Sequence, residues 1–321
     1  MKLTNFLIGI IFVAVLIFPT KINQRTMIKA ENHKNAYNEA LDNATNDAAK
    51  ELILVKDNFS LELIADGNKI NYKKVNLNLE QSLWRFYNTL FLNLNIEKNF
   101  AKQKSLLDDI PIMMAIGYDG YYIYSWEEKY INDVLEITNE WSKKKQFFMV
   151  DEKYNIKIVF TLDDYVFIED LNTGEIHQGK QESFINKYPD SCFGTKFEQV
   201  KYQVVNQMIK KDLEFYTYNN NNIAKKNGWK LKFNIPYWGD RAINEVAFIA
   251  FYQGKELVSQ KKYNTYGFGT ARIVKRDPIY GYEIDGHKLY SKNKIGTNTT
   301  NFYNEFEAAQ NGYSPDPKYY K

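Results

Sequence analysis

The chain has 321 residues, of which 44% are hydrophobic and 25% are charged, a composition that is typical of globular proteins and excludes extended disorder. Its 42 Lys and Arg residues outnumber 39 Asp and Glu residues by three, and the first 30 positions hold four of the basic residues and no acid. The rest of the chain is nearly neutral, so we expect no nucleic-acid partner bound by a broadly basic surface.

The N-terminus is strongly apolar. Residues 3–18 read LTNFLIGIIFVAVLIF, and Lys2 and Lys21 flank them. Sixteen helical residues span about 24 Å, and flanking lysines can reach the interfaces of a hydrocarbon core of roughly 30 Å. No site of the small-x-small type follows the apolar run, so residues 1–20 are predicted to be an uncleaved membrane anchor. A cleaved signal peptide is the alternative.

Two signals disagree on the orientation of this anchor. Lys2 lies on one side of it, whereas Lys21, Arg25 and Lys29 lie on the other, and the positive-inside count therefore favours a cytoplasmic body. A very short N-terminal tail is instead the layout of an exported signal-anchor. We expect a single-pass protein of the cell membrane whose body lies outside the cytoplasm.

Residues 21–56 are predicted to form a helical stalk. The segment between Lys21 and Val55 has no glycine or proline, and its apolar positions recur in steps of three and four from Met27 onward, the spacing of one helix face. Small side chains on this face allow close helix packing. The residues predicted to contact other envelope proteins are Tyr37, Leu41, Ala44, Ala48 and Leu52. A stalk that packs only on its own domain is the alternative.

Residues 57–288 are predicted to form one mixed α+β head, because helical and strand-like segments follow one another without a βαβ repeat. The expected helices cover residues 78–94, 126–145 and 196–218, the last with positions 200, 204, 208 and 215 on its buried face. A hairpin is expected over 112–126, turning at Tyr118-Asp119-Gly120. Further strands are expected at 147–150, 156–162, 165–169, 231–235, 245–252 and 272–275, with Gly254, Gly267 and Gly269 in turns.

A glycan site is the alternative functional interpretation of the head. Tyr122, Tyr124 and Trp126 share one face of the expected strand and could stack on a sugar ring. Asp119 or Asp164 could then act as a hydrolytic acid, which needs a second carboxyl group about 5 to 9.5 Å away. The competing interpretation is a sheet face packed on a helix, with solvated acids in turns.

The remaining chemistry-bearing residues form no recognisable site. Cys192 is the only cysteine, which excludes an intramolecular disulfide and a cysteine-based zinc site. The histidines, at positions 33, 177 and 287, are widely separated, and no GxSxG, HExxH or P-loop motif occurs. We therefore expect no metal, no cofactor and no enzymatic activity.

The tail, residues 289–321, carries a first resemblance. Its segment Phe306-Glu307-Ala308-Ala309 followed by Gly312-Tyr313-Ser314-Pro315 resembles the end of the small metal-binding module of Ada-type DNA-repair regulators. That module places a histidine where this chain has Ser291, and cysteines where it has Asp316 and Tyr319. The resemblance therefore implies a compact cap without zinc.

The whole chain resembles a second family. Its terminal apolar helix, alanine-rich stripe and later α+β head are similar to membrane-anchored pseudopilin-like proteins of Gram-positive tight-adherence and type II secretion-like loci. The glutamate near the start of a mature pilin helix and the glycine-type prepilin cleavage site are absent. This resemblance implies a non-enzymatic component of a surface or secretion assembly, with a membrane-anchored cell-wall or glycan hydrolase or binding protein as the alternative.

Overall fold

The computed structural model describes residues 2–54, 76–230, 232–235, 243–255, 262–272, 279–296, 299–302 and 305–319. Within these ranges, the side chains of residues 2–26, 254–255 and 262–263 are not described. Its α-helices are α1 (Lys2–Ile53), α2 (Leu79–Asn93), α3 (Phe100–Asp108), α4 (Phe197–Lys226) and α5 (Glu305–Gln310). Its strands are β1 (Ile112–Gly117), β2 (Gly120–Ile131), β3 (Val134–Trp141), β4 (Phe147–Asp151), β5 (Ile156–Phe160), β6 (Tyr165–Asp170), β7 (Ile176–Lys180), β8 (Val246–Lys255), β9 (Lys262–Ala271), β10 (Ile279–Ile284), β11 (His287–Ser291), β12 (Thr300–Phe302) and β13 (Ser314–Pro315).

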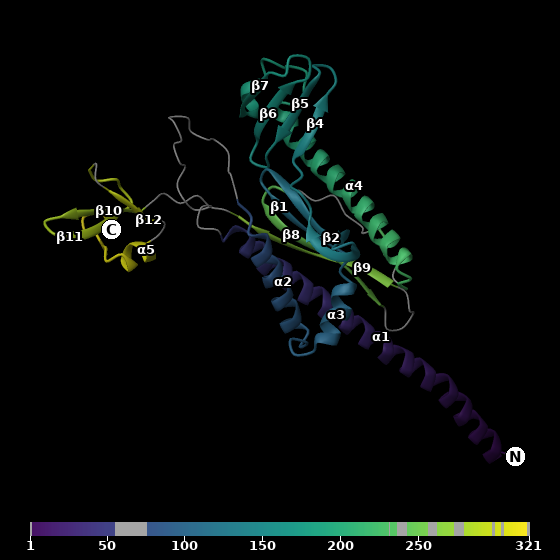
Figure 1. Ribbon diagram of the computed structural model, residues 1–321. Helices are drawn as coiled ribbons and strands as arrows, with labels where there is room; N and C mark the ends of the chain where they lie inside the picture. Colours follow the sequence, from purple (N-terminus) through teal and green to yellow (C-terminus); the bar gives the residue numbers. More distant parts are fainter. Residues whose placement is uncertain are drawn as a thin grey trace.

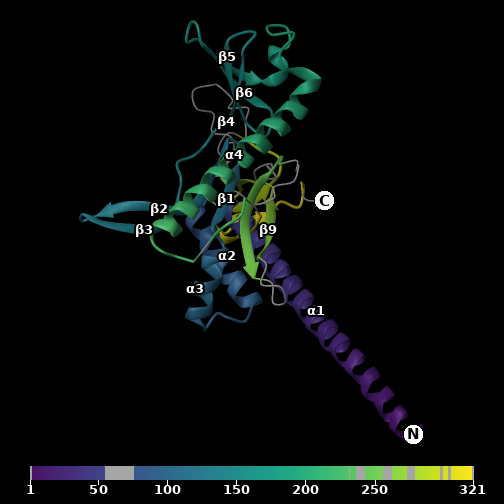
Figure 2. The same cartoon turned by 90° about the vertical axis from the view of Figure 1, so that its right-hand side faces the viewer.

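The head is built on a five-stranded antiparallel sheet of order β3-β2-β1-β8-β9. Helices α1 and α2 cover one face, where Phe86 of α2 packs against Phe248 of β8. Helix α4 covers the other face, where Tyr121 of β2 donates a hydrogen bond to Asp212 at 2.5 Å. The core therefore lies in two layers, one on each side of this sheet, as Figures 1 and 2 show.

Two glycines of β9 let α1 lie directly on the sheet. A methyl group at Gly269 would stand 2.1 Å from the carbonyl oxygen of Thr45, and one at Gly267 would stand 2.8 Å from that of Leu41. Both glycines lie inside a strand, so the prediction that they occupy turns was wrong. Gly254, in β8, was misplaced in the same way. Glycine inside a strand often marks a site where another backbone approaches closely.

A smaller antiparallel sheet, of order β4-β5-β6-β7, lies at one end of α4. The amide of Leu162, just after β5, donates to the carbonyl of Tyr118 in the β1–β2 turn at 2.8 Å. Phe160 of β5 also packs edge-on against Phe197, at the start of α4. Single-turn 3₁₀ helices at Gln181–Phe184 and Gly194–Lys196 complete this part.

The C-terminal residues form a unit with its own sheet, of order β12-β10-β11-β13. Helix α5 packs on it, and the small core consists of Ile279, Tyr290, Phe302 and Ala308 with Tyr313 against it. The described part of this unit begins at Ile279, in β10, and β10 pairs with β11 along the whole length of β11. The boundary predicted at residue 289 falls inside strand β11.

The α+β class and most expected elements are confirmed. These include α2, the β1–β2 hairpin, strands β4 to β6 and β8, and α4. The helix predicted over 126–145 was wrong, because β2 runs on to Ile131 and turns back through Asn132 and Asp133, whose φ angles are 50° and 63°. Of the strand expected at 231–235, the described part has no regular structure, and the one expected at 272–275 falls largely outside the described residues.

The predicted membrane anchor covers residues 1–20. Within the part of the chain that the structure describes, no helix is both long and apolar enough to cross a lipid bilayer. The apolar run at residues 6–18 lies outside the residues whose side chains are described.

Candidate functional site

The five residues predicted to contact envelope partners lie against the chain's own head. Leu41 is 2% exposed, and Ala44, Ala48 and Leu52 are fully buried. The half-buried Tyr37 stacks on Tyr252 of β8, with 5.4 Å between ring centroids. Helix α1 contacts β8, β9 and α2, so these side chains are covered within the chain instead of facing a partner. This arrangement corresponds to the alternative, a stalk that packs on its own domain.

The exposed part of α1 comes before this buried part. Residues 27–36 are exposed apart from the half-buried Ala30, and Met27 and Ile28 are 64% and 59% exposed. Figure 1 shows that α1 extends from the head in the direction of the N-terminus. The second half of this continuous helix is thus packed into the core, whereas its first half extends beyond the head.

A pocket of about 540 Å³ lies where α1 leaves the head. It is bounded by α1, by the end of α2 and the loop after it, by α3 and by β8. The lining residues are His33, Ala36, Tyr37, Asn93, Leu94, Asn95, Ile96, Lys102, Ser105, Leu106, Asp109 and Tyr252. Its volume is within the range of about 300 to 1,000 Å³ that is common for binding pockets. The pocket is therefore a candidate binding site on the head.

The pocket combines an aromatic wall with polar groups of both charges. His33 and Tyr37 lie with ring centroids 4.5 Å apart on α1, and Lys102 and Asp109 come from α3 and its C-cap. Burial raises the pKa of Tyr37, and the negative charge of Asp109 adds to this effect. The phenol therefore stays neutral and can donate a hydrogen bond at neutral pH.

The aromatic residues of the alternative glycan site are not arranged as one platform. Tyr124 packs against Trp141 of β3, at 5.1 Å between centroids. Trp126 is 7% exposed and packs edge-on against Trp229 and Phe233, beyond the end of α4. Tyr122 is half-buried. Tyr124 and Trp126 thus pack against different neighbours, and the three rings do not form an exposed flat surface on which a sugar could stack.

Each acid of the alternative glycan site is bound by its own lysine. Asp119, in the β1–β2 turn, pairs with Lys144. Asp164, in the β5–β6 turn, pairs with the ammonium group of Lys201 at 2.6 Å. The two turns lie side by side, because the amide of Leu162 donates to the carbonyl of Tyr118, and each acid is held there by a different lysine.

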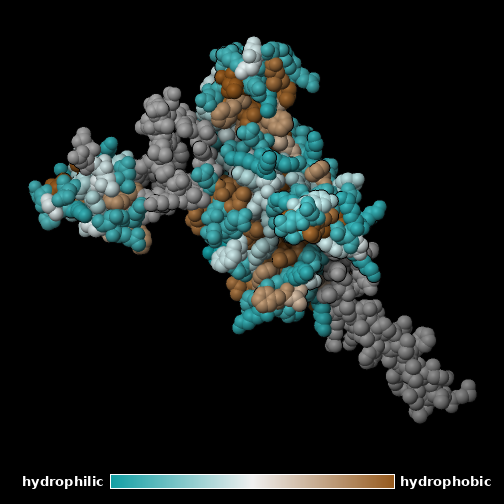
Figure 3. Space-filling model, in the orientation of Figure 1, coloured by the Kyte–Doolittle hydropathy of each residue, from teal (hydrophilic) through white to brown (hydrophobic). Residues whose placement is uncertain are grey.

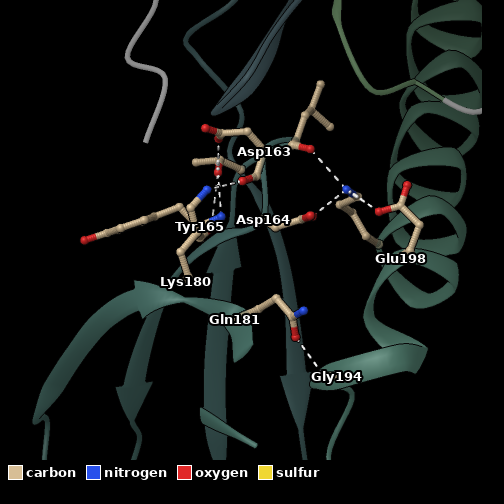
Figure 4. Close-up of polar contacts among 10 residues, drawn as sticks. Asp163, Asp164, Tyr165, Lys180, Gln181, Gly194 and Glu198 are labelled. Atoms are coloured by element: carbon tan, nitrogen blue, oxygen red, sulfur yellow. Dashed lines mark hydrogen bonds and ion pairs between the residues drawn. The ribbon is translucent and has the colours of Figure 1, made fainter. Parts of the chain in front are cut away.

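Lys201 holds the β5–β6 turn on α4. Its side chain is only 3% exposed, and it also contacts Glu198 at 2.7 Å and the carbonyl of Leu162 at 3.0 Å. Figure 4 shows Asp164 and Glu198 on either side of this ammonium group. On the same turn, Lys180 donates to the carbonyl of Asp163 at 2.7 Å. Two carboxylates and a carbonyl oxygen accept from the three hydrogen-bond donors of this buried ammonium group. Lys201 therefore fixes the turn and has no donor left for a ligand.

The C-terminal unit has hydrogen bonds where the resembled module has metal ligands. Tyr282 donates to Asp316 at 2.5 Å, and the amide of Tyr319 donates to the carbonyl of Asp316. The hydroxyl of Ser291 donates to the carbonyl of Asn293. Burial, assisted by the bond to Asp316, raises the pKa of Tyr282 to about 12. In the described part of the chain, no three His, Cys, Asp or Glu residues are placed to hold a metal ion.

Comparisons of the chain with protein-family models, with curated proteins and with solved structures found no match. Any functional inference for this protein therefore depends on its own sequence and geometry.

Proposed function

We propose that this protein is a membrane-anchored, non-enzymatic, pilin-like subunit of an envelope assembly, with its head outside the cytoplasm. The observation that supports the proposal most is the continuity of α1, which runs from Lys2 to Ile53 without a break. Its first part carries the apolar sequence, and its last part belongs to the head core. A subunit of this design is held in a membrane by the same helix that positions its head.

The joint between α1 and the head also favours this function. Ala44 and Ala48 are fully buried, and Gly269 allows the helix backbone to approach the sheet with no side chain between them. Arg85 of α2 pairs with Glu51 of α1 at 3.4 Å, and Thr89 donates to Asp47 at 3.0 Å. A head fixed in this way keeps one orientation relative to its helix, which a regular assembly requires.

Membrane retention is the first test. The full-length protein should float with membranes and stay there after a carbonate wash, and N-terminal sequencing should show that residues 6–18 are retained. A matched variant without residues 2–20 should be soluble and folded, because the described core of α1 begins near Tyr37. A mature chain that begins after Thr20, or a full-length protein released by the wash, would contradict the proposal.

Self-association through the exposed half of α1 is the second test. In a Cys192→Ser background, Met27→Cys should form disulfide-linked dimers in membranes under mild oxidation, because residue 27 is exposed on a helix shared by every copy. Ala48→Cys is the matched control, since its side chain is fully buried. Equal yields from the two variants, or none from Met27→Cys, would argue against assembly through this helix.

A further inference from the structure

The pocket between α1, α2, α3 and β8 has walls that the fold itself holds in place. The side-chain amide of Gln103 donates to the carbonyls of Ile96 and Glu97, both at 2.9 Å, and ties the loop after α2 to α3. At the other end of α3, the amide of Gln253 donates to the carbonyl of Asp109 at 2.8 Å and joins α3 to β8. A pocket with preformed walls loses little conformational entropy when it binds a ligand.

Helix α3 gives one face to this pocket. The residues of this face that line the pocket are Lys102, Ser105, Leu106 and Asp109, and steps of three and four residues place side chains on one side of a helix. Lys102 and Asp109 are seven positions apart, which separates them by about 10 Å along the helix axis. The pocket therefore has a positive end and a negative end.

The negative end has the composition of an ammonium site. Tyr37 stacks on Tyr252 with 5.4 Å between ring centroids, and both residues line the pocket together with Asp109. Burial raises the pKa of Tyr37, and the nearby carboxylate of Asp109 adds to this effect. A cation is attracted both by the faces of aromatic rings and by a carboxylate, which has about four acceptor positions.

The positive end can bind a carboxylate. Lys102 is exposed, and in the described part of the chain its ammonium group forms no ion pair. Asn95, from the loop after α2, lines the pocket as well, and its amide can donate a hydrogen bond to the same anion. One end of the pocket thus offers positive charge and donors, whereas the other offers negative charge and aromatic faces.

The lining between the two ends is mixed. Leu94, Ile96 and Leu106 are apolar, and Ser105 lies next to them. Figure 3 shows a similar mixture of apolar and polar surface around α2 and α3. An extended peptide needs this combination, because its backbone forms hydrogen bonds and its side chains need apolar contact. Such a chain advances about 3.3 to 3.6 Å per residue, so two or three residues span about 7 to 11 Å, close to the separation along α3.

We propose that the pocket binds a short peptide of two or three residues with both termini free. Its ammonium group would lie at Asp109 and the two tyrosine rings, and its carboxylate at Lys102. A ligand with opposite charges at its ends matches the one lysine and one aspartate of the described lining, whereas a neutral sugar would leave both charges unmatched. The inference goes beyond the proposed function, because it assigns a ligand to a site that neither test of that function addresses.

Titration calorimetry with the full-length protein in detergent tests this assignment. The probe is the tripeptide alanyl-leucyl-alanine, for which we expect saturable binding. The same peptide with an acetylated N-terminus, or with an amidated C-terminus, should bind at least tenfold more weakly, because each change removes one of the two terminal charges. Free leucine carries both charges on one carbon and should also bind at least tenfold more weakly.

Two variants of the protein identify which end of the pocket binds which terminus. Lys102→Ala should weaken binding of the free peptide at least fivefold but change that of the amidated peptide by less than twofold. Asp109→Asn should act in the same way with the acetylated peptide. Lys104→Ala and Asp108→Asn are matched controls, because both residues belong to α3 and neither is among the residues that line the pocket. A variant that weakens binding of every peptide equally would reveal damage to the fold and not a charge contact, and would contradict the assigned orientation.

Three outcomes would overturn the proposal. The first is no saturable binding of the free tripeptide, and the second is equal affinity for the free and the blocked peptides. The third is binding of a neutral chitin trisaccharide by a protein that does not bind the tripeptide. Loss of peptide binding with membrane retention intact would refute this inference alone, whereas loss of retention with peptide binding intact would refute the proposed function.

Discussion

The two halves of α1 have the same kind of sequence and opposite environments. From Met27 to Leu52, apolar or small side chains recur at helical spacing with one interruption, Lys34, yet Met27 is 64% exposed whereas Leu52 is fully buried. The difference comes from what lies beside the helix. Residues 37–53 have the sheet and α2 to cover them, whereas residues 27–36 are exposed apart from the half-buried Ala30.

Helical periodicity thus identifies the apolar face of a helix, but it does not show which part of the structure covers that face. In the second half of α1, the cover is the chain itself. In the first half, the described part of the chain provides little cover, and we propose that lipid along the anchor and further copies of the chain next to it provide the rest.

The largest effect should come from truncation in the buried half. Leu52→Ala removes a fully buried side chain from the junction of α1 with the head, and such cavities lower the free energy of unfolding by about 2–5 kcal/mol. Met27→Ala, in the exposed half, should change it by less than about 0.5 kcal/mol. Urea unfolding of the full-length protein in detergent, followed by tryptophan fluorescence, would measure both. Similar losses in the free energy of unfolding for the two variants would contradict the difference in burial between the two halves.

A methyl group added at the contact between helix and sheet should have the next largest effect. Gly269→Ala places a Cβ 2.1 Å from the Thr45 carbonyl oxygen, so α1 must shift, and overpacking of this kind costs about 1–3 kcal/mol. Gly179→Ala is the matched control, because a Cβ in that strand meets the Phe184 ring at an ordinary 3.4 Å. The same unfolding experiment compares them, and a cost for Gly269→Ala no greater than for Gly179→Ala would show that the close contact does not constrain α1.

Polar contacts between α1 and α2 should contribute less. Asp47→Ala removes the acceptor of the Thr89 hydroxyl, for which we expect a loss of about 0.5–1.5 kcal/mol in the free energy of unfolding. Lys50→Ala, whose side chain is 68% exposed in its pair with Asp47, should cost no more than about 0.5 kcal/mol. A double-mutant cycle between Asp47 and Thr89 measures the contact itself. A coupling energy near zero would show that this contact does not help to hold α1 on the head.

The smallest effect should be a pH dependence at the boundary between the halves. Burial and Asp109 raise the pKa of Tyr37. Its contribution to stability is therefore complete below the ordinary tyrosine value of about 10 and is lost as the pH rises through the folded-state value. The absorbance of tyrosinate near 295 nm, compared between the wild type and Tyr37→Phe, would locate this titration. Asp109→Asn should lower the pKa, and an unchanged value would contradict the assigned cause.

The sequence predicted the buried stripe of α1 but not what it touches. Steps of three and four identify Leu41, Ala44 and Leu52 as one face, because burial imposes the period of the helix. Covering that face with β9 depends on Gly267 and Gly269, and these glycines, taken alone, favoured a turn. The role of such a glycine depends on packing against distant segments, which the neighbouring residues in the sequence do not reveal.

Helix α4 was predicted with its buried face shifted by one residue. Val200, Val204 and Phe215 were expected inside, whereas the structure buries Lys201 and Val205 and leaves Phe215 60% exposed. A lysine normally signals a solvated position. Here its ammonium group is satisfied by Asp164 and by the carbonyl of Leu162, and these partners come from a turn far away in sequence.

The pocket could not have been predicted from the sequence, because segments distant along the chain line it. Its aromatic wall pairs Tyr37 with Tyr252, and its polar groups come from the region around α3. The β2–β3 hairpin could have been found through Asn132-Asp133, which is a turn signal between two strand-like runs. That segment was instead predicted to be a helix over 126–145.

A cysteine scan along α1 from residue 27 to 53, in the Cys192→Ser background, tests the central claim most directly. The rate of modification by a water-soluble maleimide would be measured at each position in native membranes or in detergent. We predict fast reaction at Met27, Ile28 and Lys50, and protection at Ala44 and Ala48, so that protection recurs with the helical period only in the second half. Equal reactivity at Ala44 and Met27, or protection of one face along the whole scan, would contradict a single helix with one half inside the head and the other beyond it.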